Sequence, residues 1–221
     1  VVSCLVTLEL TGITVSFNSA PLEWWLSLPI IVIYPLLFGW VSYQTATKLA
    51  EHKRRLQVMS TRDGMTGVYN RRHWETMLRN EFDNCRRHNR DATLLIIDID
   101  HFKSINDTWG HDVGDEAIVA LTRQLQITLR GSDVIGRFGG DEFAVIMSGT
   151  PAESAITAML RVHEGLNTLR LPNTPQVTLR ISVGVAPLNP QMSHYREWLK
   201  SADLALYKAK KAGRNRTEVA A

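Results

Sequence analysis

The chain has 221 residues, of which 44% are hydrophobic, so it is long enough for one full domain with a sizeable core and a further segment. All 25 lysines and arginines lie at or beyond Lys48, and the net charge from there onward is +5. This excess is mild: it fits a domain that binds a phosphate-bearing ligand or an anionic membrane no better than it fits an ordinary soluble domain. Two cysteines, Cys4 and Cys85, are too few for a disulfide framework and are predicted to be free thiols in a reducing compartment. We expect no nucleic-acid partner.

An apolar stretch at residues 22–41, LEWWLSLPIIVIYPLLFGWV, is interrupted by only two polar residues. A helix from Trp24 to Thr47 would rise about 36 Å, which is enough to cross a hydrocarbon core of about 30 Å. The basic residues from Lys48 onward place the rest of the chain in the cytoplasm by the positive-inside rule. Residues 1–47 are therefore predicted to end a membrane sensor, with residues 1–17 as the end of a truncated transmembrane helix. The alternative is a buried helix of a soluble protein.

Residues 48–60 are predicted to form a helical linker. Leu49 and Leu56 lie seven residues apart, which is thin support for a coiled coil, although a short helix here could pair with its twin and transmit a signal. Because the chain begins with Val1 rather than Met, we expect it to be a fragment of a longer protein.

Helical and strand patterns alternate in the remaining part, residues 61–221. The first is a helix whose apolar face consists of Trp74, Leu78, Phe82 and Cys85. The segment ATLLIIDID at 92–100 is a continuous apolar run that ends in acids, as expected for a central strand buried on both faces. A second long helix follows, with an apolar face formed by Val113, Ala117, Leu121 and Leu125.

Residues 134–147 are predicted to form a hairpin in which Gly139 and Gly140 supply the positive φ angles of a two-residue turn. The alternating segment VTLRISVGV, 177–185, predicts a half-buried strand. Two more helices are expected on either side of that strand, and their apolar residues are Ile156, Met159, Leu160 and Leu166, then Trp198, Ala202, Leu206 and Ala209 before Gly213. Helices packed against a mixed or antiparallel sheet predict an α+β sandwich.

Four carboxylates are predicted to meet at one end of this sheet. The buried strand delivers Asp98 and Asp100, and a hairpin paired beside it brings Asp141 and Glu142 to the same place. Carboxylates gathered in this way are costly without a cation, and hard oxygen ligands suit Mg²⁺, with Mn²⁺ as a possible substitute, in a site that also binds phosphates. Because successive strand residues point to opposite faces, the side chain of Asp98 rather than that of Ile99 should aim at the metal.

The glycines of RFGGDEF, residues 137–143, have a second possible use. Without side chains, the backbone N–H groups of Gly139 and Gly140 can approach a phosphate closely. The alternative is an ordinary hairpin with surface acids, and the four letters GGDE alone do not decide between the two readings.

Three segments together resemble the GGDEF family of diguanylate cyclases: RFGGDEF, DIDHFKSINDTWGHDVGDEAI at 98–118 and DGMTGVYNRR at 63–72, in the family's order and spacing over about residues 61–217. The family's usual leucine before Thr66 is Met65, which fills similar space. Residues 1–60 are also similar to the end of the membrane sensor of an enterobacterial member. The resemblance implies a nucleotidyl-cyclase, palm-like fold at the bacterial inner membrane, with the catalytic domain in the cytoplasm.

The resemblance also implies an activity, the condensation of two GTP into cyclic di-GMP with release of two pyrophosphates, and a role for each matching residue. Asp98, the backbone carbonyl of Ile99 and Asp141 would hold the metal, and Asp141 or Glu142 would accept a proton. Asn106 and Asp115 would read the guanine edge, although a helix cap and an exposed first-turn acid are the ordinary uses of such residues. The remaining implied contacts, to the nucleotide and its phosphates, are Phe102, Lys103, His111, Gly139, Gly140, Lys210 and Arg214.

One domain with one guanine pocket holds one GTP, so the resemblance implies a homodimer. The segment RGSD, 130–133, resembles the family's inhibitory site, at which cyclic di-GMP would contact Arg130, Asp133 and Arg161. On the residues alone, Arg130 ends a helix and Asp133 is a turn acid. Two other functions stay open: a catalytically inactive GGDEF domain that acts as a receptor for GTP or cyclic di-GMP, and a cyclase that closes a 3′,5′ ring within one nucleotide. The intact RFGGDEF tip favours the diguanylate cyclase.

Overall fold

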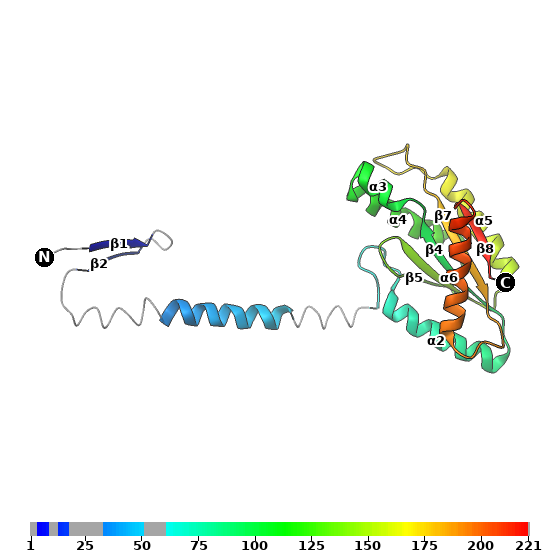
Figure 1. Cartoon of the computed structure of the whole chain (residues 1–221), viewed down its shortest axis with the longest axis horizontal. Coiled ribbons are helices and arrows are strands. Elements are labelled where there is room, and N and C mark those ends of the chain that lie inside the picture. The colour runs from blue at the N-terminus through cyan, green and yellow to red at the C-terminus, as the bar shows by residue number, and fades with distance from the viewer. Residues whose placement is uncertain (1–3, 9–12, 18–32, 51–60, 221) are drawn as a thin grey trace. The chain divides into compact units, whose positions relative to one another are not determined.

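The computed structural model describes residues 4–8, 13–17, 33–50 and 61–220 (Figure 1). The chain divides into two compact units, Val1–Met59 and Ser60–Ala221, and each is described here by itself.

In the first unit, β1 (Cys4–Leu8) and β2 (Ile13–Phe17) form an antiparallel pair in which Val6 lies opposite Val15. These residues form strands where we expected the end of a transmembrane helix. The physical reason is the alternation within β2, where the apolar residues Ile13, Val15 and Phe17 are separated by the polar residues Thr14 and Ser16, a period of two that fits a strand better than a helix.

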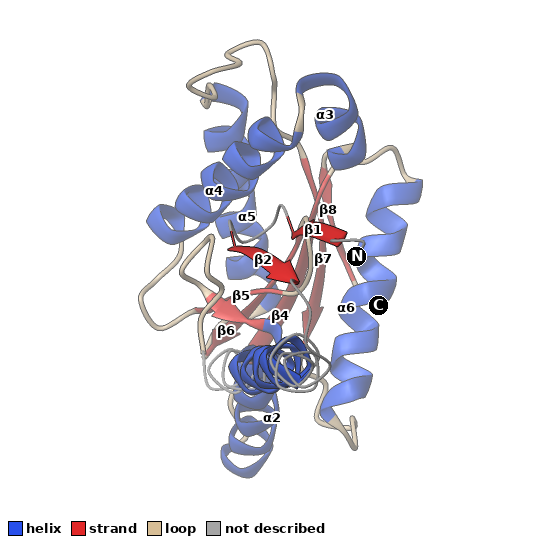
Figure 2. Ribbon diagram, turned by 90° about the vertical axis from the view of Figure 1, so that its left-hand side faces the viewer, coloured by secondary structure: helices blue, strands red, loops and turns tan. Residues whose placement is uncertain are grey.

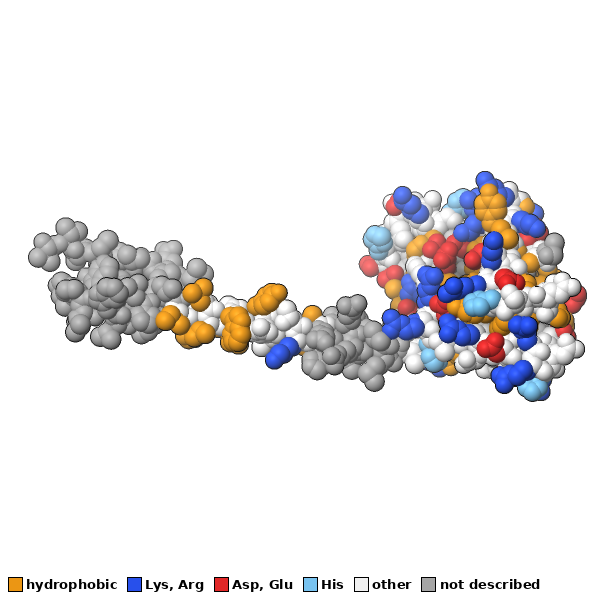
Figure 3. Space-filling model, turned by 60° about the horizontal axis from the view of Figure 1, so that its bottom comes forward, with side chains coloured by type: hydrophobic (Ala, Val, Ile, Leu, Met, Phe, Trp, Pro, Cys, Tyr) orange, Lys and Arg blue, Asp and Glu red, His pale blue; other side chains and the backbone are white. Residues whose placement is uncertain are grey.

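Residues 33–50 of the first unit are helical and carry exposed hydrophobic side chains (Figure 3), among them Tyr34, Phe38 and Trp40. No helix within the described ranges is both long enough and apolar enough to cross a membrane. Residues 22–32 of the expected span and residues 51–60 of the expected linker lie outside the described residues.

The second unit is built on a sheet with the strand order β3-β5-β6-β4-β7-β8. The central strand β4 (Ala92–Ile99) runs antiparallel to both of its neighbours, β6 (Glu142–Ser148) and β7 (Ile181–Pro187). Outside them, β5 (Val134–Arg137) is antiparallel to β6, whereas the edge strands β3 (Tyr69–Asn70) and β8 (Arg216–Val219) run parallel to their neighbours. The mixed sheet confirms the predicted α+β class.

Helices cover both faces of this sheet (Figure 2). α4 (His111–Thr128) and α5 (Ala152–Thr168) share one core with Leu95 and Ile97 of β4. α2 (Arg71–His88) and α6 (Tyr195–Lys211) share the other core with Leu94 and Ile96. Because alternate residues of β4 point into the two cores, the strand is buried along its whole length, as predicted. The short helix α3 (Phe102–Trp109) follows β4 and was not predicted.

Two predicted burial patterns were wrong. The strand that we expected over 177–185 begins at Ile181, and it is buried on both faces because α6 packs directly on it: a Cβ at Gly184 would lie 2.2 Å from the carbonyl oxygen of Ala202. In α5, Leu160 is 55% exposed, and the small residues Ala155 and Ala158 face the core instead. The buried faces predicted for α2, α4 and α6 are confirmed.

Candidate active site

The end of β4 and the tip of the β5–β6 hairpin form one site. In the antiparallel register of β4 and β6, Asp98 lies opposite Glu142. The register continues past the strand, because the backbone N–H of Ile99 donates to the carbonyl of Asp141 at 3.3 Å. The hairpin therefore brings Asp141 and Glu142 beside Asp98, as the strand pairing predicted.

Asp98 is only 8% exposed, and its carboxylate is paired with the ammonium of Lys210, from the last turn of α6, at 2.7 Å. Burial raises the pKa of Asp98; the contact with Lys210 opposes this shift, and the negative charges of Asp141 and Glu142 add to it. Among the described residues, Lys210 is thus the cation that stabilises this buried carboxylate beside other carboxylates. The family resemblance implied that Lys210 contacts phosphates, and in the structure its partner is Asp98.

The connection between β5 and β6 differs from the expected two-residue turn. It comprises the four residues 138–141, and neither Gly139 nor Gly140 has a positive φ. The backbone N–H of Phe138 donates to the carbonyl of Glu142 at 2.8 Å and closes the loop. Because four residues allow the chain to reverse with ordinary backbone angles, the glycines are not needed for the turn.

The space around these glycines is open. A Cβ built on Gly140 would meet no heavy atom of the described residues within 4 Å, and one on Gly139 would meet only a carboxylate oxygen of Glu142, at 3.9 Å. Neither the φ angles nor the packing of the described residues therefore requires glycine at either position. Bare backbone at this tip leaves room for a group from outside the chain.

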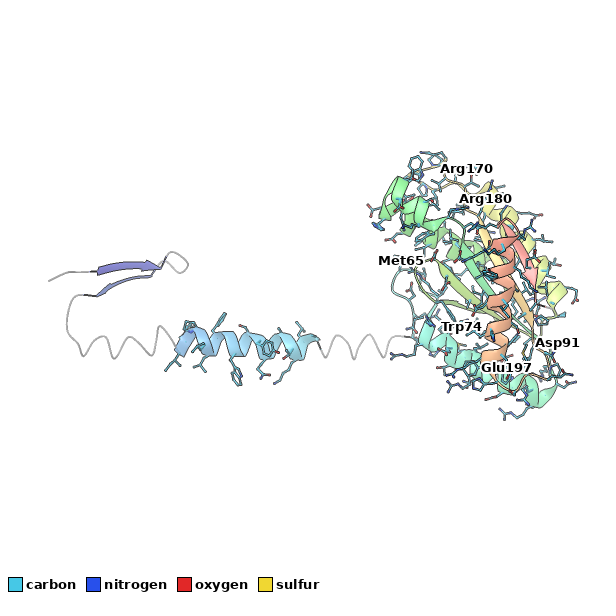
Figure 4. All side chains as sticks on the ribbon, in the orientation of Figure 1. Met65, Trp74, Asp91, Arg170, Arg180 and Glu197 are labelled. Carbon is cyan, nitrogen blue, oxygen red and sulfur yellow. The ribbon has the colours of Figure 1, made fainter. Side chains whose placement is uncertain are left out.

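Arg137 holds the tip in place, and the sequence analysis assigned it no role. Its guanidinium donates to the carbonyls of Gly139 and Gly140, the latter at 2.8 Å, and to a carboxylate oxygen of Asp63 at 3.1 Å. It also contacts the sulfur of Met65 at 3.4 Å, on the loop before α2 (Figure 4). The DGMTG segment and the RFGGDEF segment, far apart in the chain, are thus joined by one side chain.

The helices α3 and α4 bring together the residues expected to contact the nucleotide. Phe102 and Asn106 are half-buried on α3, and Asn106 lies against the first turn of α4, where a Cβ at Gly114 would be 1.9 Å from its Oδ1. That oxygen is buried and has no hydrogen-bond partner among the described residues, so its capacity as an acceptor is unused. Gly114 is a further residue that the sequence analysis missed. The other expected contacts on these helices, Lys103, His111 and Asp115, are exposed.

Arg214 lies just beyond α6, in the segment that leads to β8. Its side chain is exposed and its backbone is left-handed, with φ 61°. Lys210 and Arg214 therefore extend from the end of α6, next to the end of β4.

The donor atoms at the end of β4 fit a hard divalent cation, because the expected ligands are all oxygens: the carboxylates of Asp98 and Asp141 and the carbonyl of Ile99. No group of three or more His, Cys, Asp and Glu side chains within the described ranges is arranged to hold a metal by itself. Asp100 is not available as a further ligand, because Ser182 and the backbone of Asn215 donate to its two carboxylate oxygens.

The RGSD segment forms a closed turn. Helix α4 ends at Thr128, so Arg130 lies beyond the helix rather than at its end as predicted. The backbone N–H of Arg130 donates to Oδ2 of Asp133, and that of Asp133 donates to the carbonyl of Arg130, both at 2.9 Å. Oδ1 of Asp133 is buried without a hydrogen-bond partner in the described part of the chain, and burial raises the pKa of this carboxyl. Arg130 and Arg161 are exposed.

The chain is similar to proteins that carry the same fold and motifs. The family model described as "Diguanylate cyclase, GGDEF domain" matches residues 60–216. Diguanylate cyclase DosC of Escherichia coli strain K12 is 35% identical over 159 residues, which are 71% of this chain and 34% of that protein, so the chain spans about a third of this relative.

Two solved structures are similar along most of the chain. The GGDEF domain of DgcB from Caulobacter crescentus, solved in complex with c-di-GMP, is 30% identical with a TM-score of 0.69, covering 72% of this chain and 93% of that one. Diguanylate cyclase SiaD from Pseudomonas aeruginosa, solved with its activator SiaC, is 32% identical with a TM-score of 0.69, covering 90% and 78%. The chain therefore belongs to the GGDEF family of diguanylate cyclases, and residues 60–216 are its GGDEF domain.

Proposed function

We propose that the chain is an active diguanylate cyclase, which condenses two GTP into cyclic di-GMP and releases two pyrophosphates. The observation that carries this proposal is the open backbone of Gly139 and Gly140 beside the buried carboxylate of Asp98. A hairpin that served only the fold would require neither the bare tip nor the gathered acids.

The oxygen donors at the end of β4 would hold Mg²⁺, or Mn²⁺ in its place, through Asp98, the carbonyl of Ile99 and Asp141. The cation would supply positive charge at the substrate phosphates when bound. Lys210 would exchange its pairing with Asp98 for the phosphates, together with Arg214 and Lys103. The backbone of Gly139 and Gly140 would face the same phosphates.

The guanine would lie between α3 and α4. The orphaned Oδ1 of Asn106 can accept from a guanine N–H, and the exposed carboxylate of Asp115 can accept from another. Phe102 and His111 would line this pocket. The bond-forming step is attack by the 3′-hydroxyl of one GTP on the α-phosphorus of the other, with pyrophosphate as the leaving group. Asp141 or Glu142 would accept the hydroxyl proton, and we favour Asp141.

Two chains are required for this reaction, because the product contains two nucleotides and each domain offers one guanine pocket. The working enzyme would be a homodimer, in which each chain supplies one GTP. Initial velocity should then rise faster than linearly with enzyme concentration wherever ultracentrifugation finds mostly monomer. A linear dependence in that range would contradict the dimer.

Membrane attachment at the bacterial inner membrane, with the catalytic domain in the cytoplasm, is also part of the proposal. It is supported by the apolar sequence 22–41, by the basic residues after it, and by the exposed hydrophobic side chains of the segment 33–50. Extraction of the full chain from bacterial membranes by detergent, but not by high salt or alkaline carbonate, is the expected result.

The decisive experiment is incubation of the purified full chain with GTP and Mg²⁺, and separately with ATP, followed by mass spectrometry of the products. Cyclic di-GMP is the expected product. Cyclic GMP would point instead to a cyclase that acts within one nucleotide. Binding of GTP or cyclic di-GMP without turnover would identify a receptor.

A further inference from the structure

Two acids at the end of β4 hold the two ends of one short segment, 210–215. Asp98 is paired with the ammonium of Lys210 at 2.7 Å, at the beginning of the segment. Oδ2 of Asp100 accepts the backbone N–H of Asn215 at 2.8 Å, at its end. Between these two contacts lies Arg214, so two of the three basic residues expected to bind phosphate belong to a segment that is held at each end by an acid at the end of β4.

The carboxylate of Asp100 is fixed from within the protein. The residue is 6% exposed, and its Oδ1 accepts from the hydroxyl of Ser182 on β7 at 2.7 Å. Its backbone N–H donates to the carbonyl of Arg180 at 2.9 Å. Ser182 itself has no exposed surface, so the pair is enclosed. Asp100 therefore presents Oδ2 to Asn215 in a defined direction.

The contact at Asn215 stabilises an unfavourable backbone conformation. Three consecutive residues have positive φ: Gly213 at 111°, Arg214 at 61° and Asn215 at 46°. Glycine adopts such angles without steric cost and asparagine more readily than most residues, so the cost falls mainly on Arg214, and outside contacts are needed to keep the segment in this conformation. Two backbone bonds supply them: the N–H of Arg214 donates to the carbonyl of Ala209 at 3.0 Å, and the N–H of Asn215 donates to Asp100.

We propose that Asp100 is a positioning residue that orients Lys210 and Arg214 toward the phosphates of GTP through the backbone of Asn215. This inference rests on the proposed function, which assigns phosphate contacts to those two residues. The two acids then have separate tasks. The pairing of Asp98 with Lys210 is broken when the phosphates draw the lysine away, whereas the bond from Asn215 to Asp100 persists and keeps the segment in place.

The test compares the binding of GTP with that of guanosine, which has the base but no phosphates, in the full chain. Asp100→Ala should weaken GTP binding at least tenfold and leave guanosine binding within twofold. Asp100→Asn should recover most of the loss, because its amide oxygen can still accept from Asn215 and its amide nitrogen can donate to Ser182. In turnover, the Ala variant should raise KM for GTP more than it lowers kcat.

Three further variants separate positioning from general damage. Asp91→Asn changes an exposed acid just before β4, near the end of the sheet remote from Arg180 (Figure 4), and should have no effect. Leu125→Ala opens a cavity in the core beneath α4 and α5, on the face of the sheet opposite α6. It should lower the Tm without changing the ratio of the GTP affinity to the guanosine affinity. If Asp100→Ala does not fold, Ser182→Ala removes one contact of the carboxylate and should weaken GTP binding selectively, to a smaller extent.

Several results would overturn the positioning role. Equal weakening of GTP and guanosine, or an Asn variant as impaired as Ala, would make Asp100 a purely structural residue. So would an undiminished effect of Asp100→Ala in a chain that already carries Lys210→Ala and Arg214→Ala. A wild type that binds GTP more tightly than guanosine but makes no cyclic di-GMP would defeat the proposed activity alone. A wild type that binds GTP no more tightly than guanosine would defeat the positioning role, because the phosphates would then contribute nothing to binding.

Discussion

The guanidinium of Arg137 lies 3.1 Å from a carboxylate oxygen of Asp63, and the same guanidinium holds the carbonyls of Gly139 and Gly140. The ion pair connects the first residues of the domain with the tip of the β5–β6 hairpin. Since the side chain of Arg137 is only 12% exposed, its contacts limit the movement of the tip. The acids and the bare glycines beside them are therefore presented in one geometry.

Loss of this side chain should reduce turnover without abolishing the fold. Arg137→Ala frees the two glycine carbonyls, and a displacement of about 1 Å at a reacting group can cost about 100-fold in rate. We expect kcat to fall by about that factor, with GTP binding much less affected. Arg137→Lys should be intermediate, because an ammonium cannot bridge the carbonyls and Asp63 in the same planar arrangement.

Arg72→Ala is the matched control, since Arg72 is an exposed arginine on α2. An Arg137→Ala enzyme with wild-type kcat would show that the tip needs no support from this residue.

The same ion pair predicts a dependence of stability on pH. Burial raises the pKa of Asp63, but hydrogen bonds from Thr66 and Arg137 outweigh it, so the pKa of Asp63 lies below its usual range. A lowered folded-state pKa means that the ionised form is favoured by folding. This contribution is complete above the unfolded pKa of about 3.9, and it is lost as the pH falls through the lower folded value.

Thermal unfolding of the wild type and of Asp63→Asn tests this. The variant should have the lower Tm at neutral pH, and the two curves should converge as the pH approaches and passes below about 3.9. A difference in Tm that grows toward acid pH would have the wrong sign for the proposed ion pair.

The open space at the hairpin tip gives a prediction that separates fold from function. Gly140→Ala places a methyl group where no heavy atom of the described residues lies within 4 Å, and the residue does not have a positive φ. The free energy of unfolding should stay within about 0.5 kcal/mol of wild type or rise slightly. Turnover should fall at least tenfold, because the methyl group occupies the space for the phosphates.

Gly131→Ala is a suitable control when initial rates are compared, before product accumulates, since Gly131 is another glycine with no heavy atom of the described residues near its Cβ position and lies before the start of β5, at the opposite end of that strand from the tip. If Gly140→Ala retains full turnover, the glycines do not serve the substrate.

Helices and strands could be predicted from the sequence where apolar residues recur with the spacing of one buried face. Trp74, Leu78, Phe82 and Cys85 have helical spacing and are the buried residues of α2. Side-chain periodicity carries no information on contacts between distant segments. The bond from Arg137 to Asp63 spans 74 positions in the chain, and that from Asn215 to Asp100 spans 115. Such contacts depend on which strands lie near one another in the sheet. For the bond from Asn215 to Asp100, the strand order places β8 two strands from β4.

The glycines illustrate a different limit. A Gly-Gly pair in a hairpin predicts positive φ angles, because that is the usual reason for glycine in a tight turn. In this chain the loop has four residues and ordinary angles at both glycines. The expectation failed because the connection has four residues instead of two, so the chain reverses without positive φ angles; under the proposed function the glycines serve the substrate instead.

Asp141 should be essential for turnover and dispensable for folding. Its backbone carbonyl accepts the N–H of Ile99, and this bond does not involve the side chain. Asp141→Asn removes a charge at nearly constant volume, so the Tm should be preserved or increased while cyclic di-GMP formation falls below detection. Magnesium-dependent turnover by a well-folded Asp141→Asn protein would exclude the carboxylate as a metal ligand and as the proton acceptor.

The last prediction concerns product inhibition at Arg130. Its backbone N–H and carbonyl both bond to Asp133, so the turn is maintained by atoms that Arg130→Ala leaves in place. The exposed guanidinium is then free to bind a ligand, and the orphaned Oδ1 of Asp133 can accept from the N–H groups of a guanine. Asp133 variants would disturb the turn itself, which makes Arg130→Ala the cleaner test. We expect unchanged initial turnover and an at least tenfold higher concentration of cyclic di-GMP for half inhibition, which corresponds to a loss of about 1.4 kcal/mol. Arg123→Ala, an exposed arginine on α4, is the control. Superimposable inhibition curves for wild type and Arg130→Ala would mean that the RGSD turn only connects α4 to β5.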